Sequence, residues 1–370
     1  MKQFYQCTQE DMNDIINIAN DAFAPEREFG FDFRKIMPKV YNHKEMAETH
    51  YAIKDNDKIV SLVGRLIQPI TLNGKQYSFS FLGTVSTPVE HRNQGLMHEL
   101  ITQIESDSKS RGITFGMLTG ARRRYAEFGY AKCYTAYNFT FEEYTLRCFK
   151  GSSNISILEC TPKDTDLLLE LYKKSELLQI RTLANLFECL QTSNSSVFLI
   201  KNGPHPIGYF SYSSRKDLIT ELVVTDYEAL PQILCAILEG LKIPMLKVLT
   251  STTQKTLVKH LKTFSEESAL IDDLQIKVYD VARFLEFLFE LNFERLQGVE
   301  CKESYTIDDT TYLISIANNN YKITINQHPS DNRYSLEQFT RNILGDANNE
   351  LCATSRIFPL NFGLTIPDTF

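Results

Sequence analysis

The chain has 370 residues, of which 43% are hydrophobic and 23% are charged, and its formal net charge is −7. A chain of this length is expected to form two or three domains, with enough apolar residues for a core in each. The negative net charge argues against non-specific nucleic-acid binding, which requires a basic face.

The cysteine pattern and the N-terminal sequence indicate a cytoplasmic protein. The eight cysteines are scattered without a C-x-x-C pair, and the seven histidines form no ligand-spaced set with them. This pattern favours reduced, buried thiols and no metal site. The N-terminal sequence includes acidic side chains, unlike a signal peptide. No segment approaches the roughly 20 apolar residues that span a bilayer, so no membrane partner is expected.

The N-terminal part of the chain predicts a strand, a helix and a mixed segment. Residues 2–7 form a short strand pattern. Thr8 begins a capping-box-like sequence with acidic residues in the first turn, which predicts a helix to about Phe23. Residues 25–48 are rich in aromatic and charged side chains and contain two prolines, so a helix-and-loop segment is expected there.

The next part predicts a hairpin followed by a strand, a helix and a strand. The hairpin strands cover 50–54 and 59–66, and a third strand covers 76–85. A turn then leads into an amphipathic helix that ends near Arg111, and 113–118 is an apolar strand pattern. Such a unit implies that its two strands pair in parallel through a right-handed crossover.

A second module repeats this order after residue 150. A helix over 164–190 comes first. The pattern then predicts a hairpin, a strand, a helix and a strand, over 196–212, 217–224, 229–241 and 247–252. We interpret this as a weak internal duplication. The second copy carries Asp226-Tyr-Glu-Ala-Leu-Pro where the first has a glycine turn, so it is not expected to bind a phosphate there.

A third module is expected from about Leu274. Its pattern predicts a helix, three strands and a second helix, over 281–291, 305–307, 311–317, 321–326 and 335–344. The tail after it contains Arg356-Ile-Phe-Pro-Leu-Asn-Phe, which is too apolar for a free end. We therefore expect the tail to pack against the rest of the protein.

The turn Arg92-Asn-Gln-Gly95 carries the strongest functional signal in the first module. The first N–H groups of a helix have no internal partner, and the helix dipole adds positive potential there. Gly95 removes a side chain that would block a close approach, so this turn is suited to a pyrophosphate. The alternative is a glycine in an ordinary strand–helix loop.

Residues 80–130 resemble the acetyl-CoA-binding core of GNAT acetyltransferases, whose signature is Gln or Arg, two residues, Gly, one residue, and Gly or Ala. Arg92 and Gly95 match this signature, whereas Met97 stands at its last, small position. Larger residues at that position are familiar in the enhanced intracellular survival (Eis) branch. That branch also has a duplicated GNAT unit and a C-terminal sterol-carrier-protein-like domain, and the order of modules here is similar over the full length.

The resemblance implies an α/β (α+β) fold in which a duplicated GNAT unit, each with a mixed sheet flanked by helices, precedes a sterol-carrier-protein-like α+β domain. The implied domains are a catalytic GNAT domain over 1–150, a degenerate GNAT-like domain over 151–273 and a sterol-carrier-protein-like domain over 274–370. The third domain is expected to deliver the C-terminus to the active site rather than to carry lipid.

The resemblance also assigns the residues that would hold acetyl-CoA. The strand before the turn would pair with the pantetheine arm, and the turn would hold the pyrophosphate. The implicated residues are Val85, Ser86, Thr87, Arg92, Asn93, Gln94, Gly95, Leu96, Met97 and His98, with Gly120 and Ala121 after the next strand. A surface ion pair is the alternative for Arg92.

Tyr125 lies in a segment similar to the family pattern Y-x-x-F-G-Y, which here ends at Tyr130. The resemblance implies that Tyr125 is the general acid, and a phenol with a pKa near 10 can protonate the departing CoA thiolate. A core tyrosine is the alternative, and Tyr130 is expected to be structural. The arginines Arg122–Arg124 would meet CoA phosphates or remain solvated.

The C-terminus is the expected base. In Eis-like enzymes the terminal carboxylate takes the proton of the acceptor amine, and this chain ends in the aromatic residue Phe370. A packed or frayed tail is the alternative. An aromatic, acidic stretch is a candidate for the acceptor pocket. Placement in the core or on the surface is an equal alternative for each of its residues. They are Asp21, Phe23, Glu28, Phe29, Phe31, Asp32 and Phe33.

Together these features imply an acetyl-CoA-dependent N-acetyltransferase without a metal. The acceptor would be a primary amine of a small cationic or polyamine-like molecule, such as an aminoglycoside-like compound or a lysine amine. The resemblance to the Eis branch also implies a homo-oligomer. Two alternatives remain, a non-catalytic acyl-CoA or lipid binder and an acyltransferase for longer chains, since N-myristoyltransferases also duplicate this fold.

Overall fold

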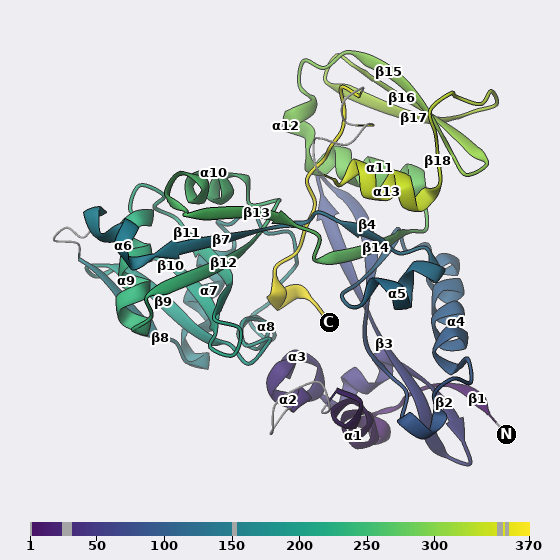
Figure 1. The fold of residues 1–370 in the computed structure, drawn as a ribbon, viewed down its shortest axis with the longest axis horizontal. Helices are drawn as coiled ribbons and strands as arrows, with labels where there is room; N and C mark the ends of the chain where they lie inside the picture. The colour runs from purple at the N-terminus through teal and green to yellow at the C-terminus, as the bar shows by residue number, and fades with distance from the viewer. Residues whose placement is uncertain (1, 24–31, 150–153, 346–350, 352–354) are drawn as a thin grey trace.

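The computed structural model describes residues 2–23, 32–149, 154–345, 351 and 355–370 (Figure 1). Within these residues the strands form three sheets, of seven, seven and four strands. Helices pack on the sheet faces, and the C-terminal tail runs from the third sheet to a point between the other two (Figure 1).

The first sheet has the order β1-β2-β3-β4-β5-β14-β6. Its strands are β1 (Gln3–Gln6), β2 (His50–Asp55), β3 (Lys58–Leu72), β4 (Lys75–Ser86), β5 (Phe115–Leu118), β14 (Leu274–Val278) and β6 (Ala131–Cys133). Strands β4 and β5 are parallel and are connected by helix α4 (Leu96–Ser110), as the sequence pattern predicts. Leu96, Leu100, Ile101 and Ile104 of α4 are buried, which confirms the predicted apolar face. Helix α1 (Met12–Phe23) follows the predicted capping box at Thr8.

The second sheet repeats this arrangement, with the order β13-β7-β12-β11-β10-β9-β8. Its strands are β7 (Ala136–Glu142), β8 (Ile155–Glu159), β9 (Ser196–Asn202), β10 (His205–Ser213), β11 (Leu218–Val224), β12 (Met245–Ser251) and β13 (Glu267–Ile271). The parallel pair β11 and β12 is bridged by α9 (Leu230–Leu241), just as β4 and β5 are bridged by α4. The predicted duplication is therefore confirmed.

Two strands cross between the modules that the sequence suggests. Strand β7 lies within residues 1–150 but pairs with β12 and β13 in the second sheet. Strand β14 lies after residue 273 but is inserted between β5 and β6 in the first sheet. Leu274 and Ile276 of β14 are fully buried. The first sheet is therefore complete only when a segment far along the chain adds to it.

The third sheet has the order β17-β16-β15-β18 and packs against two helices. The strands are β15 (Cys301–Ile307), β16 (Thr310–Ala317), β17 (Asn320–Asn326) and β18 (Arg333–Tyr334), and the helices are α11 (Val281–Leu291) and α13 (Leu336–Ile343). The α11 side chain of Phe287 also lies 5.5 Å from the ring of Phe115 in the first sheet. The third sheet and the first sheet therefore share one continuous core.

The helix predicted over 164–190 is shorter than expected. Helix α7 ends at Tyr172, and a short helix α8 covers Leu186–Leu190. Between them the chain is irregular, and the backbone N–H of Thr182 bonds to the side chain of Asn185 at 2.8 Å. Local side-chain acceptors of this kind compete with helical hydrogen bonds. Helix α10 (Lys255–Phe264) packs on the second sheet, whereas the short helices α2 (Phe33–Ile36) and α3 (Pro38–Tyr41) belong to the first module, and α3 contacts α8.

The C-terminal tail is buried, as its apolar sequence predicts. Five apolar residues of the tail are each at most 3% exposed: Ile357, Phe358, Leu360, Phe362 and Leu364. The tail ends in the short 3-10 helix η8 (Ile366–Asp368), which leads to Phe370. The end of the chain thus lies between the first two sheets, close to α3 and α8 (Figure 1).

Candidate functional site

The site is built on the C-terminal end of β4. Pairing between β4 and β5 ends at Leu82, so among the described residues the strand continues from Gly83 to Ser86 without a neighbour on that side. The register with β3 shifts between Gly83 and Ser86, and Thr84 adopts a positive φ of 51°. A bulge of this kind bends a strand and redirects its side chains. It leaves backbone groups at the end of β4 free to pair with a ligand.

The turn that follows β4 has the conformation that an anion site needs. Asn93 and Gly95 both have positive φ, of 60° and 75°. Gly95 is the N-cap of α4, and its carbonyl accepts the N–H of Glu99 at 3.0 Å. The N–H groups of the first helical residues therefore have no partner within the helix. They point toward the turn with the positive end of the helix dipole.

A cavity of about 410 Å³ lies over this turn. It is lined by ten residues that the sequence assigns to acetyl-CoA: Val85, Ser86, Thr87, Arg92, Asn93, Gln94, Gly95, Leu96, Met97 and His98. Arg124, which the sequence suggests as a CoA-phosphate contact, and Phe23, a candidate for the acceptor pocket, also line it, whereas sequence reasoning missed Ala22, His91 and Glu127. The structure thus brings the strand end and the turn together around one space.

Several polar side chains shape the rim of this cavity. The Arg92 Nε donates to the carbonyl of Thr87 at 3.1 Å, which ties the turn to the strand. Arg92 takes part in none of the ion pairs found among the described residues, so its predicted alternative role as a surface ion pair is not seen there. Ser86 Oγ is buried, lines the cavity and has no hydrogen-bond partner among the described residues. A bound molecule can supply that partner.

Tyr125 lies at the end of the short helix α5 (Arg122–Tyr125), beside the cavity. It is 6% exposed, and burial raises the pKa of its phenol above the ordinary value. Its ring lies 3.0 Å from the position that a Cβ on Gly120 would occupy. Tyr125, Gly120 and Ala121 are not among the residues that line the 410 Å³ cavity, although the neighbouring Arg124 is.

The neighbours of Tyr125 have different roles. Tyr130 is fully buried, and its hydroxyl lies 3.4 Å from that of Tyr279. This position agrees with the structural role expected for it. Arg122 lies 3.6 Å from Glu337, a surface ion pair. Of the three arginines, Arg124 is the one that lines the cavity.

The last residue, Phe370, packs directly on the first sheet. It is 7% exposed. The ring of Phe370 lies over Gly64. One oxygen of its terminal carboxylate is 2.8 Å from the position that a Cβ added to Gly83 would occupy. The ring centre is 5.6 Å from that of His50. The chain terminus therefore lies at the bulge of β4, two residues before the first cavity-lining residue Val85.

Of the described residues that are candidates for the acceptor pocket, Phe23 lines the 410 Å³ cavity. Phe33 is a core residue whose ring packs 5.2 Å from that of Phe23. Asp32 caps α2 by accepting the N–H of Arg34 at 3.0 Å, and Asp21 is exposed. The remaining three residues considered there, Glu28, Phe29 and Phe31, lie outside the described residues.

A second cavity, of about 460 Å³, lies between the first and second modules. It is lined by α3, β3 and the irregular segment before α8, and includes Asp368 of the tail. Glu45 and Glu188 place carboxylates on its wall. His43 Nε2 and Glu188 are 2.5 Å apart. Sequence patterns gave no signal for this cavity, because its walls come from three distant segments.

The described residues also bear on two other kinds of site. They contain no group of three or more His, Cys, Asp or Glu side chains arranged to hold a metal ion. No helix in the described part of the chain is long and apolar enough to cross a membrane.

Comparison with solved structures shows the same architecture over the whole chain. A GCN5-related N-acetyltransferase from Anabaena variabilis is 16% identical with a TM-score of 0.70, and the match covers all of both chains. One from Kribbella flavida is 14% identical with a TM-score of 0.67, covering 100% of this chain and 98% of the other. Eis1 from Mycobacterium abscessus is 11% identical with a TM-score of 0.63, again over both full chains. The TM-scores over the full chains show a common fold, and at these low identities they show the fold alone.

Comparison at the level of sequence is more limited. No curated protein sequence matches this chain. Residues 3–133 match the family model described as an acetyltransferase (GNAT) domain. This range contains Tyr125 together with β4, the turn at Gly95 and helix α4, which are the parts that the cavity brings together. The chain therefore carries a GNAT acetyltransferase domain, within a mixed α/β fold that duplicates the GNAT-like arrangement of sheet and helices.

Proposed function

We propose that the protein is an acetyl-CoA-dependent N-acetyltransferase that acts on primary amines of small cationic acceptors. One observation carries this proposal: the cavity at the turn and the end of the chain meet on the same strand. Phe370 contacts Gly83, and Val85 lines the cavity. At about 3.3 Å per residue for extended chain, these two positions on β4, which flank the bulge at Thr84, are at most about 7 Å apart. This is a suitable separation for a thioester and a base.

The residues around the cavity fit the parts of acetyl-CoA. Backbone groups at the end of β4, beyond its pairing with β5, would bind the pantetheine arm, together with the Ser86 hydroxyl, which has no partner among the described residues. The N-terminus of α4 would bind the pyrophosphate, and Arg124 would add positive charge. When bound there, acetyl-CoA supplies an acetyl thioester that an amine can attack.

Tyr125 is the proposed acid. A phenol is protonated at neutral pH, and burial raises the pKa of Tyr125 further, so this residue holds a proton for the departing thiolate. Its position in the segment after β5 places it beside the cavity-lining Arg124.

The Phe370 carboxylate is the proposed base. A carboxylate is a weak base in water, so its contribution depends on its position next to the amine. That position is fixed by the packing of the Phe370 ring against Gly64 and His50.

We propose a cationic acceptor because acidic groups lie near this terminus. The 460 Å³ cavity reaches the tail two residues before Phe370, where Asp368 is paired with Arg181, and it presents Glu45 and Glu188 on its wall. The chain also has a net charge of −7. Carboxylates that line an entry route attract ammonium groups and raise their local concentration. An aminoglycoside-like molecule, a polyamine or a lysine amine has this chemistry.

An Eis-like organisation is part of the same proposal. It comprises a catalytic domain over 1–150, a degenerate copy over 151–273 and a sterol-carrier-protein-like domain over 274–370 that delivers the C-terminus. The full-length match to the fold of Eis1 supports it. A cytoplasmic homo-oligomer is the corresponding expectation for the assembled protein.

The first test is release of CoA thiol from acetyl-CoA in the presence of aminoglycosides, spermidine, lysine-rich peptides and arylamines. Wild type should release thiol with at least one multi-amine acceptor. Tyr125→Phe should lower kcat about 100-fold or more, the usual range for loss of a general acid. Tyr144→Phe, at an exposed tyrosine, is the matched control and should leave kcat unchanged.

Two results would contradict this proposal. Binding of acetyl-CoA without thiol release from any amine would favour a binding protein. Preference for butyryl- or myristoyl-CoA in competition with acetyl-CoA would indicate transfer of longer chains.

The second test concerns the terminus itself. Adding one glycine after Phe370 keeps the aromatic ring but moves the terminal carboxylate by one residue, about 3.5 Å. This variant should lose at least about 10-fold in kcat, while its melting temperature and acetyl-CoA affinity stay close to those of wild type. Full activity in the extended protein would exclude the carboxylate as the base.

A further inference from the structure

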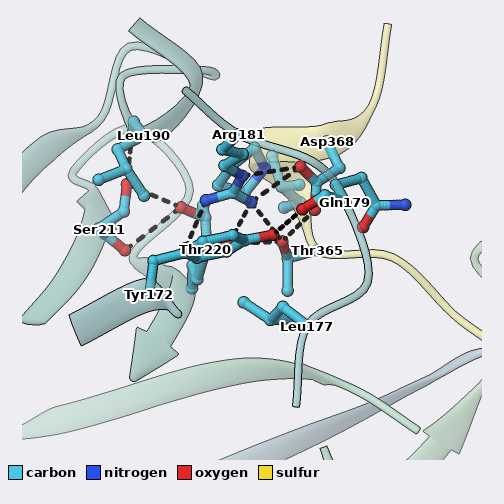
Figure 2. A network of polar contacts seen from close by, with 12 residues as sticks. Tyr172, Leu177, Gln179, Arg181, Leu190, Ser211, Thr220, Thr365 and Asp368 are labelled. Atoms are coloured by element: carbon cyan, nitrogen blue, oxygen red, sulfur yellow. Dashed lines mark hydrogen bonds and ion pairs between the residues drawn. The ribbon is translucent and has the colours of Figure 1, made fainter. Parts of the chain in front are cut away.

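A buried ion cluster joins the second module to the C-terminal tail (Figure 2). Arg181 lies in the irregular segment before α8 and donates two parallel hydrogen bonds to Glu221 of β11, at 2.8 and 2.7 Å. Its Nε donates to Asp368 of the tail at 3.0 Å. One guanidinium thus bridges a strand of the second sheet and the last turn of the chain.

The cluster is removed from solvent and its polar atoms are largely paired. The side chains of Arg181, Glu221 and Asp368 are 2%, 0% and 3% exposed. Thr365 donates to Glu221 at 2.6 Å, and Tyr209 donates to the other oxygen of Glu221 at 2.7 Å. The planar fork of an arginine matches two carboxylates in a way that a lysine cannot.

A second cation approaches the cluster from the first module. Lys39 of α3 donates to the carbonyl of Pro367 at 2.5 Å, next to Asp368. Lys39 therefore ties the first module to the backbone beside the cluster. Elements from both modules converge on one turn of the tail.

The cluster lies very close to the terminal carboxylate. Asp368 is held through its side chain by Arg181, and its carbonyl lies 3.5 Å from Gln68 Nε2 of β3. Phe370 follows two residues later and lies on Gly64 and Gly83. Two residues span at most about 7 Å, so fixing Asp368 confines the terminal carboxylate to a small volume.

We infer that Arg181 is a positioning residue for the reaction: through Asp368 it holds the terminal carboxylate of Phe370 at the active site. This inference rests on the proposed function, in which that carboxylate is the base. It also gives the second module a task. That module has no phosphate-binding turn of its own, but it holds the base that serves the first module.

Stability alone is a weak explanation for this cluster. Burying ions is costly, and well-packed apolar side chains often replace buried ion pairs without loss of stability. An ion cluster does, however, fix the direction of the groups that it joins, because charge-assisted hydrogen bonds from a guanidinium are directional. Because the cluster lies two residues before the terminus, the direction that it fixes for Asp368 also determines where the terminal carboxylate lies.

The test compares Arg181→Met and Arg181→Lys with a control arginine. Arg65 is also buried and forms an ion pair with Asp107 at 2.6 Å, but it contacts no residue of the tail in the described structure. Arg65→Lys therefore controls for the general effect of altering a buried ion pair. All variants are assayed below their melting transitions, so that each is folded.

Two readouts separate positioning from folding. The first is the split between kcat and the KM for acetyl-CoA. Arg181→Met should lower kcat at least about 10-fold with KM for acetyl-CoA unchanged, because the cofactor cavity does not include Arg181. Arg181→Lys should recover part of the loss, and Arg65→Lys should keep its kcat.

The second readout does not depend on activity. A carboxypeptidase that removes aromatic residues should release Phe370 slowly from wild type and Arg65→Lys, and at least about 10-fold faster from Arg181→Met, since local opening of the tail controls its access. An unchanged release rate would overturn the inference. Faster release with full kcat would also overturn it, because the terminus would then be held without being used. If wild type acetylates no amine, the proposed function fails, and the release rate still decides whether Arg181 holds the terminus.

Discussion

At the scale of single residues, the contact between Phe370 and two glycines decides where the chain ends. A Cβ added to Gly64 would lie 2.2 Å from Cε1 and 2.5 Å from Cζ of the Phe370 ring. No side chain contact is tolerated at such distances, so the ring would have to move. The terminal carboxylate would move with it.

Gly64→Ala is therefore expected to lower kcat at least about 10-fold by displacing the base, with acetyl-CoA binding retained. Gly240→Ala is the matched control, because its added Cβ would meet its nearest neighbour, Ile157 Cδ1, at an ordinary 3.6 Å. Steady-state kinetics and calorimetric titration of acetyl-CoA on both variants test this. Equal kcat in the two variants would contradict it.

His50 gives the protein a pH dependence of stability. It is fully buried beside Phe370, and burial lowers the pKa of its imidazole to about 4 from an ordinary 6.5. Between these values the unfolded chain binds a proton that the folded chain does not. The free energy of unfolding should therefore fall as the pH drops from 6.5 to 4, with this residue contributing on the order of 3 kcal/mol.

Urea denaturation of wild type and His50→Gln across this pH range measures that contribution. The variant should be less stable than wild type at pH 7, because its hydrogen bonding beside Tyr41 and Met46 is altered. Its stability should decline less steeply on acidification. Parallel curves for the two proteins would show that His50 does not titrate in this way.

At the scale of elements, the glycine at the start of α4 can be compared with the glycine at the C-terminal end of the same helix. Gly95 and Gly112 flank the helix, with φ of 75° and 69°, and no protein atom lies within 4 Å of a Cβ added to either. Alanine at each position should cost a similar stability, about 1 kcal/mol for a left-handed residue. Gly95 differs in that it lines the cavity.

Gly95→Ala should therefore weaken acetyl-CoA binding about 10-fold or more, because the methyl group occupies the space of a phosphate, while Gly112→Ala should leave it unchanged. Calorimetric titration gives the affinities and urea denaturation gives the stabilities. Equal affinities for the two variants would exclude the turn as the pyrophosphate site.

The elements also show where periodicity suffices and where it does not. The strand and helix on either side of Gly95 were predicted, because alternation and a buried helical face are local properties. The helix predicted over 164–190 is interrupted, and the interruption carries Arg181 into the buried cluster. Burial of a charge with partners elsewhere in the chain outweighs local helix preference there.

At the scale of the whole molecule, the crossing strands couple the modules. Strand β14 lies between β5 and β6, and its Leu274, Ile276 and Val278 are buried. A fragment that contains residues 1–150 lacks this strand and exposes the edges of β5 and β6. The fragment therefore loses the burial of these three side chains, each of which contributes about 2 kcal/mol to the free energy of folding.

The 1–150 fragment is therefore expected to lack a cooperative thermal transition when it is expressed alone. Co-expression with the fragment 151–370 supplies β14 and β13 and should restore a folded, acetyl-CoA-binding complex. Circular dichroism melting and co-purification measure these outcomes. A sharp transition in the isolated 1–150 fragment would show that the first sheet does not need β14.

The sequence by itself determined the repeated order of hairpin, strand, helix and strand and the turn from Arg92 to Gly95, since these depend on neighbours a few residues apart. It also pointed to Tyr125 and Phe370 through family resemblance. Only the tertiary structure decided that β14 completes the first sheet and that Arg181 meets Asp368, 187 residues away. Local patterns specify which face of an element is buried. They do not specify which distant segment covers it, because that choice depends on packing and charge pairing across the whole chain.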